Sequence, residues 1–341
     1  MTIQKNRQPT LGEDPQGNPG VVQSVFQVLA KTRMRRSILI ISVVVGLVTS
    51  SFAAGLSFVL LKRDLIEGRL RSFSRNDTER EIVLKNMFIE AGCKDQVMEK
   101  PVRHVKQPDL ICVLPGQSQQ LIFVGAHFDH VDAGDGVVDN WSGASLLPSL
   151  YQVLRTRPTR HTFVFISFSG EEKGELGSES YVDSMTKDEV ARSEAMVNLD
   201  TLGLGPTAVW LSHADPHLAQ GLAAVARAMK LPISAVNVER VGSSDSEQFA
   251  RRKIPRVTIH SLTQDTLPIL HSQRDKISAM RLDDYYDSYR LLAAYLVYLD
   301  ETLGEPATTR RAPSQQMSSL HENLFTFLRQ FPIPSRSRRA G

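Results

Sequence analysis

Histidine and carboxylate side chains follow several short apolar runs of this 341-residue sequence, and these are the side chains that metal binding and acid–base catalysis require. His127 and Asp129 form a His-x-Asp pair directly after the apolar run 121–126. A carboxylate two residues from a histidine can orient the imidazole of a metal ligand. Such a pair also occurs on ordinary protein surfaces, so it does not define a site by itself.

Further carboxylates occupy the same kind of position. Asp139 is followed by Asn-Trp-Ser-Gly at the expected start of a helix, a tight turn that would hold its carboxylate in a fixed geometry. Glu171 and Glu172 follow the apolar run 162–168. Adjacent carboxylates repel each other, so this pair is either an exposed loop or a site where one binds a cation and the other acts as a base. Asp200 ends the next apolar run, where an aspartate is also a common turn former.

The elements that must position these side chains alternate between strand and helix patterns over residues 64–304, which predicts one α/β domain with a mixed, mainly parallel sheet between layers of helices. Because the carboxyl ends of parallel strands meet at one edge, His127, Asp200 and the later His271 should lie close together. We expect a hairpin at 97–104 and 110–114, strands at 121–126, 162–168, 195–199 and 257–259, and helices at 76–91, 145–154, 216–229 and 282–303. The first helix should be capped by Asp77 or Thr78, with Glu81 completing a Thr-x-x-Glu box.

Six sequence blocks in this region resemble, in the same order, the zinc aminopeptidases of the M28 peptidase family. The blocks are GAHFDH at 125–130, VDNWSGAS at 138–145, SGEEKGELGS at 169–178, NLDTLG at 198–203, SSDSEQF at 243–249 and HSQRDK at 271–276. The resemblance implies a three-layer αβα fold of the phosphorylase/hydrolase-like zinc exopeptidase type, and a metallo-aminopeptidase acting on peptides with a free N-terminus. Two alternatives share the scaffold: a glutaminyl-peptide cyclotransferase, against which the peptidase-like EEKGELGS argues, and a non-catalytic peptidase-like ectodomain.

Carried over residue by residue, the resemblance implies two metal ions that share one carboxylate. His127 and Asp200 would bind one ion, Glu172 and His271 would bind the other, and Asp139 would bridge both. Two histidines and three carboxylates suit Zn²⁺, and they would also accept Mn²⁺ or Co²⁺. Two such ions would share and activate the attacking water.

The resemblance also implies roles for the residues around the ligands. Glu171 would be the general base, and Asp129, counted with it in the catalytic set, would hold His127. Asp275, in a His-x-x-x-Asp arrangement with His271, would stabilise the loop of that ligand.

Four further residues bear on the site. Trp141 stands where the family usually has a small residue, which predicts a narrowed mouth or a stacking surface for substrate. Asp245 is a further candidate for a contact around the substrate. Ser246 replaces a histidine common in the SSDSEQF block, and this puts any role of that position in doubt. His260 ends an apolar strand, so we expect it to be structural and not a metal ligand.

Residues 37–61 contain no charge over 25 positions, a length of about 37 Å as a helix. This stretch predicts an uncleaved single-pass anchor in the lipid bilayer. A cleaved signal peptide is the main competitor, but the region before the stretch is long and the stretch exceeds a usual signal core. Charges flank both ends, so they do not set the orientation. The family resemblance favours an exported, periplasmic or extracellular catalytic domain.

The formal net charge of +3 is unevenly distributed along the chain. Residues 1–63 hold eight Lys or Arg and two acidic residues (+6), and residues 305–341 hold six Arg and two acidic residues (+4). The remaining 26 basic and 33 acidic residues give residues 64–304 a net charge of −7. Because phosphate binding needs a basic face on the folded part, a nucleic-acid-binding body is disfavoured.

The two ends and the two cysteines complete the expectations. Residues 1–36 read as a disordered basic tail, and residues 305–341 as a linker and a basic tail with a short amphipathic helix. Cys93 and Cys112 would pair if the body is exported, although two buried thiols are equally ordinary.

Overall fold

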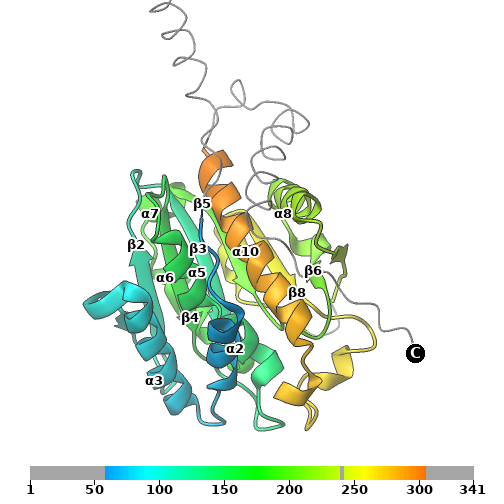
Figure 1. The fold of residues 1–341 in the computed structure, drawn as a ribbon. Coiled ribbons are helices and arrows are strands. Elements are labelled where there is room, and N and C mark those ends of the chain that lie inside the picture. The colour runs from blue at the N-terminus through cyan, green and yellow to red at the C-terminus, as the bar shows by residue number, and fades with distance from the viewer. Residues whose placement is uncertain (1–57, 239–241, 305–341) are drawn as a thin grey trace, which may run out of the picture. The chain divides into compact units, whose positions relative to one another are not determined.

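A computed structural model describes residues 58–238 and 242–304 of the chain (Figure 1). The predicted tails 1–36 and 305–341 and most of the predicted anchor lie outside these residues. Within the described part, no helix is long and apolar enough to cross a membrane.

The last four residues of the predicted anchor are described, and here the prediction is wrong. Residues 58–61 are not helical, and Phe58 is buried in the core of the body. The Leu61 amide donates to the Tyr289 hydroxyl at 2.8 Å, and the Tyr286 hydroxyl donates to the Leu61 carbonyl at 3.1 Å. These contacts show that the body begins earlier than residue 64. The sequence did not reveal this, because an uncharged apolar run reads the same whether its end faces lipid or a protein core.

An eight-stranded mixed sheet forms the centre of the body, in the order β1-β2-β4-β3-β5-β8-β6-β7. The four central strands β4, β3, β5 and β8 run parallel to one another, whereas β1, β2 and β6 join by antiparallel pairing. The strands are β1 Met98–Lys100, β2 Asp109–Leu114, β3 Leu121–His127, β4 Thr162–Phe168, β5 Ser193–Leu199, β6 Thr207–Val209, β7 Ile233–Ala235 and β8 Arg256–His260. The mixed sheet expected from the sequence is therefore confirmed.

Helices cover both faces of the sheet. Figure 1 shows α10 lying across one face between α5 and α8, both of which it contacts. On the other face, α6 contacts α9, and α9 packs on β5 and β8. The helices are α2 Arg63–Arg71, α3 Asp77–Phe88, α4 Ser142–Ala144, α5 Leu147–Leu154, α6 Leu176–Ser184, α7 Lys187–Ala191, α8 Pro216–Met229, α9 Ser246–Arg251 and α10 Leu282–Thr302.

The central strands are buried on both faces because their residues alternate between two apolar cores. In β3, Ile122 and Val124 belong to the core under α5, α8 and α10, whereas Leu121 and Phe123 belong to the core under α6 and α9. Strands of this kind read as continuous apolar runs. This double burial explains why the sequence shows them so clearly.

The N-terminal cap of α3 differs from the expected one. The Asn76 side chain accepts from the amides of Thr78 and Glu79, at 2.9 and 3.2 Å, so Asn76 is the cap in place of Asp77 or Thr78. Asparagine is among the strongest N-cap residues, and its side chain reaches the second and third amides of the helix.

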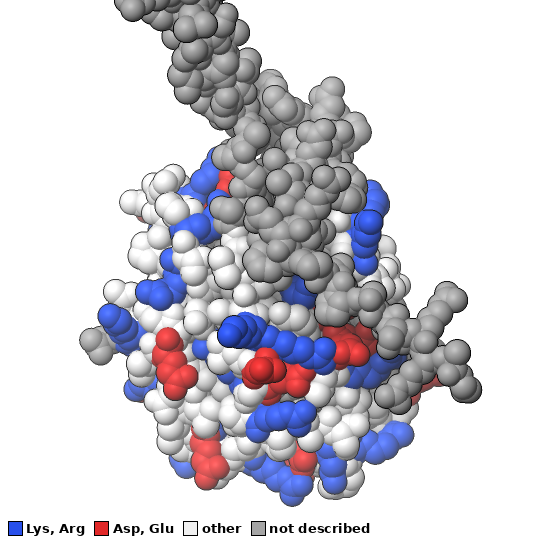
Figure 2. All heavy atoms as spheres, in the orientation of Figure 1, with Lys and Arg blue, Asp and Glu red and all other residues white. Residues whose placement is uncertain are grey.

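A disulfide joins Cys93, just after α3, to Cys112 in β2. It ties the helical layer to the antiparallel edge of the sheet across a sequence separation of 19 residues. Charged residues of both signs are mixed over the face of the body shown in Figure 2. That face therefore does not display the −7 of residues 64–304 as a continuous acidic surface.

Candidate metal centre

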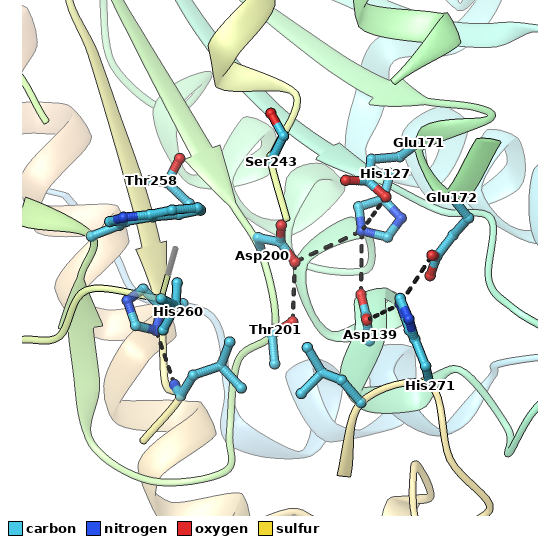
Figure 3. Close-up of a pocket in the computed structure, with 14 residues that line it drawn as sticks. His127, Asp139, Glu171, Glu172, Asp200, Thr201, Ser243, Thr258, His260 and His271 are labelled. Carbon is cyan, nitrogen blue, oxygen red and sulfur yellow. Dashed lines mark hydrogen bonds and ion pairs between the residues drawn. The ribbon is translucent and has the colours of Figure 1, made fainter. Parts of the chain in front are cut away.

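The predicted site residues converge on one pocket at the carboxyl ends of the four parallel strands (Figure 3). His127 ends β3, Glu171 and Glu172 follow β4 in a short 3₁₀ turn, and Asp200 follows β5. His271 comes from the loop after β8. All five predicted ligands and the predicted base line this pocket: His127, Asp139, Glu171, Glu172, Asp200 and His271.

Asp139 lies at the centre of the cluster, between the two histidines. Its Oδ1 is 3.3 Å from His127 Nε2, and its Oδ2 is 3.3 Å from His271 Nε2. On either side, His127 Nε2 is 3.7 Å from Asp200 Oδ1, and His271 Nε2 is 3.0 Å from Glu172 Oε2. One carboxylate therefore faces both halves of the site.

Two sets of three donor atoms share this aspartate. The first set is His127, Asp139 and Asp200, and the second is Asp139, Glu172 and His271. Within each set, the donor atoms lie within 4.8 Å of one another. A third set, His127 with Glu171 and Glu172, meets the same criterion, which places the Glu171 carboxylate against the first two sets.

Asp129 positions the two glutamates. Its Oδ1 accepts from the Glu171 amide at 3.1 Å, and its Oδ2 accepts from the Glu172 amide at 3.2 Å. The same carboxylate lies 3.7 Å from His127 Nδ1. Gly170, with φ of 73°, makes the sharp bend from β4 into this turn. Asp129 thus connects the carboxyl ends of β3 and β4.

The loop that carries Asp139 is fixed from two directions. Asp275 accepts from the amides of Val138 and Asp139, at 2.7 and 3.1 Å. It was expected to stabilise the loop of His271, and the structure adds that its carboxylate holds the segment of the shared aspartate. From the other side, the Asn140 amide group donates to the Leu199 carbonyl at 2.8 Å, which ties the loop to the end of β5.

The pKa values of the cluster reflect mutual attraction of the histidines and carboxylates. Hydrogen bonds to Asp139 and Glu172 raise the pKa of His271 to about 10. Burial opposes charge on His127, but Glu171 and the neighbouring aspartates raise its pKa well above the usual range. Burial likewise opposes charge on Asp139, but both histidines lower its pKa. The carboxylates of this cluster therefore stabilise positive charge placed among them, here on the two histidines.

For Glu171, Glu172 and Asp245, burial outweighs the attraction of the histidines, so these carboxylates are protonated more easily than usual. Burial raises the pKa of Glu171 well above its ordinary value, and the charges of Asp245 and Asp200 add to the effect. Burial also raises the pKa of Glu172 and of Asp245. Asp245, predicted as a candidate for a contact around the substrate, is wholly buried and does not line the pocket. Its influence on the site is electrostatic, because its negative charge raises the pKa of Glu171.

The expectation for Trp141 is wrong. Its side chain is wholly buried, and its indole N–H donates to the Arg69 carbonyl at 3.1 Å. The Arg80 guanidinium lies over the Trp141 ring, with its Cζ 5.5 Å from the ring centroid. The ring does not line the pocket. The residue points back from the tight turn toward α2 and α3, so it neither narrows the mouth nor offers a stacking surface to substrate.

His260 and Ser246 have structural partners. His260 Nδ1 accepts from the Leu262 amide at 3.0 Å, and its Nε2 donates to the Val236 carbonyl at 3.0 Å. Burial lowers the pKa of His260, so the ring is neutral and both nitrogens are occupied. The Ser246 hydroxyl lies 2.9 Å from that of Thr258 in a buried cluster of hydroxyl groups.

The apolar side of the pocket was not foreseen from the sequence. Trp210, Val238, Leu262 and Leu270 line it beyond Asp200. Trp210 follows a three-residue strand and Val238 lies in a loop, so neither belongs to a pattern long enough to place it. Arg80 was also missed, and its signal was a charge within the otherwise apolar stripe of α3.

The chain is similar in sequence and in fold to known aminopeptidases. An aminopeptidase of Bacillus subtilis (strain 168), YwaD, is 24% identical over 254 residues, which is 72% of this chain and 53% of the relative. The structure of a zinc aminopeptidase from Bacillus subtilis matches with a TM-score of 0.53 at 25% identity, over 59% of this chain and 51% of that chain. The structure of a glutaminyl cyclase from an Acidobacteriales bacterium matches with a TM-score of 0.59 at 14% identity, over 70% of this chain and 93% of that chain.

The extent of these matches differs. The chain spans about half the length, or less, of the curated relatives it matches. The similarity to the glutaminyl cyclase shows a shared fold alone. The model of Peptidase family M28, by contrast, matches residues 109–296, which is more than half of the chain and contains all the residues of the two donor sets. This protein therefore belongs to Peptidase family M28.

Proposed function

We propose that this protein is a zinc-dependent aminopeptidase that hydrolyses the N-terminal peptide bond of its substrate. The observation that carries the proposal is the pair of three-atom donor sets that share Asp139. The zinc aminopeptidase among the similar structures supports the choice of metal and of reaction.

The residues fit two ions. His127, Asp139 and Asp200 would hold one, and Asp139, Glu172 and His271 would hold the other. Within the described residues, the buried Glu172 Oε1 has no hydrogen-bond partner, as expected of an oxygen kept for a cation. Imidazole and carboxylate together suit Zn²⁺, and Mn²⁺ or Co²⁺ would be accepted. Bound zinc would supply a Lewis acid for the scissile carbonyl and lower the pKa of a water molecule.

Glu171 is the general base in this proposal. Its carboxylate lies 3.9 Å from His127 Nε2, at the edge of both donor sets. Because burial raises its pKa, this oxygen can accept a proton from the attacking water and release it to the leaving amine. Asp129 contributes by accepting the amides of Glu171 and Glu172, which keeps the base and a ligand in one orientation.

The rest of the pocket favours a substrate with a free N-terminus. The excess of carboxylates attracts a protonated amino group. The apolar wall formed by Trp210, Val238, Leu262 and Leu270 would receive the side chain of the first residue.

The proposal is tested by assaying the purified full chain with zinc against aminoacyl, dipeptidyl and N-terminal glutamine substrates in parallel. We expect release of a single N-terminal residue. Cyclisation of glutamine without hydrolysis would assign the protein to the glutaminyl cyclase reaction instead. Absence of turnover with every substrate would favour a non-catalytic ectodomain.

A variant pair tests the role of Glu171. Glu171→Gln should keep its zinc and lose about 10²- to 10⁴-fold in kcat, the usual contribution of a general base. Glu179→Gln is the matched control, because Glu179 lies on α6 and pairs with Arg251 at the surface. Wild-type turnover in Glu171→Gln would remove this residue from the mechanism.

We also propose that residues 37–57 anchor the protein in a membrane and that the body is exported. These 21 uncharged, mainly apolar residues would span about 31 Å as a helix, enough for a bilayer. The Cys93–Cys112 disulfide supports export, because such bonds persist in oxidising compartments. Protease added to intact cells or spheroplasts should digest the body. A body protected until the membrane is permeabilised would place it inside.

A further inference from the structure

Arg80 is a charged residue in the buried stripe of α3. The stripe consists of Arg80, Leu84, Met87 and Phe88, and the Arg80 side chain is wholly buried. Burying a guanidinium is costly unless its N–H groups find acceptors. The acceptors of its N–H groups therefore indicate the role of this buried cation.

Four backbone carbonyls accept hydrogen bonds from the guanidinium, and Nε donates to the first of them, that of Ser74, at 2.6 Å. Nη1 donates to the Phe128 carbonyl at 2.9 Å, and Nη2 donates to the carbonyls of Asp135 and Gly136, at 2.7 and 2.9 Å. Phe128 directly follows His127, and Gly136 comes three residues before Asp139. Arg80 thus joins the two ends of the loop 128–136, which separates two residues of the first donor set.

The neighbouring residues hold the same loop from the same side. Asp77 of α3 pairs with His130 at 2.8 Å, and Arg75 pairs with Asp135. Gly136 leaves room for the guanidinium, because a Cβ at this position would lie 2.6 Å from Arg80 Nη2. Its φ of 57° also suits glycine.

Arg80 also brings a positive charge close to the acidic site. Burial lowers its pKa to about 10, while Asp77, Asp275, Asp129 and Asp139 oppose the change. The group is therefore a cation at neutral pH. The Trp141 ring below it, directly after the tight turn of the shared aspartate, is a favourable surface for that charge.

We propose that Arg80 is a positioning residue that sets the spacing of His127 and Asp139 for metal binding. Residue 80 precedes the family-matched residues 109–296, so a segment outside that match completes the site. The inference rests on the metal centre of the proposed function. Partners that orient metal ligands typically contribute about 10- to 100-fold to metal affinity.

The test compares zinc affinity by chelator competition in the full-length wild type, Arg80→Lys, Arg80→Met and Arg252→Met. Arg252 is the matched control, because its guanidinium donates to the carbonyls of Val182 and Met185, at 2.8 and 3.3 Å, at the end of α6. We expect Arg80→Met to bind zinc at least about 10-fold more weakly and Arg80→Lys to fall between it and the wild type. Arg252→Met should match the wild type.

Thermal unfolding separates positioning from general stability. A purely structural role of Arg80 would lower the midpoints of the metal-free and zinc-loaded forms equally. A positioning role should reduce the increase that zinc produces, because weaker binding stabilises less. If Arg80→Met does not fold, Arg80→Lys decides, since lysine keeps the charge but lacks the planar fork whose separate nitrogens reach the carbonyls at both ends of the loop.

Two results would overturn the inference: wild-type zinc affinity in a folded Arg80→Lys or Arg80→Met, or an equal loss in Arg252→Met. A wild type that binds no zinc would overturn the proposed function as well.

Discussion

Asp109 provides a prediction in which a single buried carboxyl sets a pH dependence of stability. It begins β2 and is wholly buried. Its Oδ1 accepts from the Ser169 amide at 2.9 Å and from the Ser169 hydroxyl at 3.2 Å, and Oδ2 has no partner within the described residues. Burial raises its pKa from 3.8 to about 7. The neutral carboxyl is therefore the form that the fold prefers.

The sign follows from linkage between folding and protonation. Because the pKa is higher in the folded state, the stabilisation by Asp109 is fully present below pH 3.8 and is lost as the pH rises through about 7. At about 1.36 kcal/mol per pH unit, the difference amounts to at most about 4 kcal/mol. Asp109→Asn cannot ionise, and its carbonyl oxygen can still accept both bonds from Ser169.

The assay measures the free energy of unfolding of the wild type and of Asp109→Asn in urea, with circular dichroism as the signal. It is repeated from pH 5 to pH 8 at constant zinc. The advantage of the variant should grow by about 1 kcal/mol per pH unit up to pH 7 and then level off. Titration of other groups cancels in the difference. An advantage that stays constant over this range would refute the reasoning.

Asp300→Asn is the control with the opposite expectation. Asp300 is also wholly buried, but it accepts from the amides of Arg160 and His161, at 2.9 and 2.8 Å. Burial opposes its charge, but His161 and these amides lower its pKa below 3.8. Its stabilisation is therefore complete above pH 3.8, so the variant should be less stable by the same amount from pH 5 to pH 8.

Three further predictions concern the scaffold of the site. Replacing both Cys93 and Cys112 by Ala should lower the free energy of unfolding by about 3 kcal/mol, because the crosslink closes a loop of about 20 residues; urea unfolding that matches the wild type would contradict it. Gly143→Ala should cost about 1–3 kcal/mol, since its Cβ would lie 2.5 Å from the Leu199 carbonyl oxygen; an unchanged melting temperature would show that the turn relaxes freely. Asp275→Ala should leave two buried amides without an acceptor, cost about 1–3 kcal/mol for each, and weaken zinc binding in a chelator titration, whereas an effect on stability alone would separate Asp275 from the site.

The long, doubly buried elements were predictable from the sequence. The range 162–168 predicted for a strand is that of β4, and the range 216–229 predicted for a helix is that of α8. Strands β6 and β7 were missed because each has three residues, too few to show a period. The helices α6 and α9 are short and carry polar faces, so their apolar positions do not form a long stripe.

The candidate ligands came from the resemblance of six sequence blocks to Peptidase family M28, and all five lie at or after the carboxyl end of a strand of the central parallel set. Their shared position at strand ends depends on local sequence, which a reader of the sequence can follow. The hydrogen bonds that hold the ligand segments in place, by contrast, join residues far apart in the sequence. Arg80 meets its carbonyl acceptors in the loop 128–136 at separations of 48 to 56 residues, and Asp275 meets its amides 136 and 137 residues away. Trp141 was misplaced for the same reason, since its partners lie in α2 and α3.

The two tryptophans of the chain differ in their relation to the candidate metal centre: Trp210 lines its pocket and Trp141 does not. Trp210 forms part of the pocket wall and stacks on His213 with centroids 4.3 Å apart, whereas Trp141 lies under the loop that Arg80 holds. Their indoles are therefore built-in fluorescent reporters of two separate events. Emission from Trp210 would respond to a side chain entering the pocket, and emission from Trp141 to movement of the ligand loop. In variants that keep only one tryptophan each, a change at the pocket wall and a change at the loop 128–136 could therefore be followed separately without any attached label.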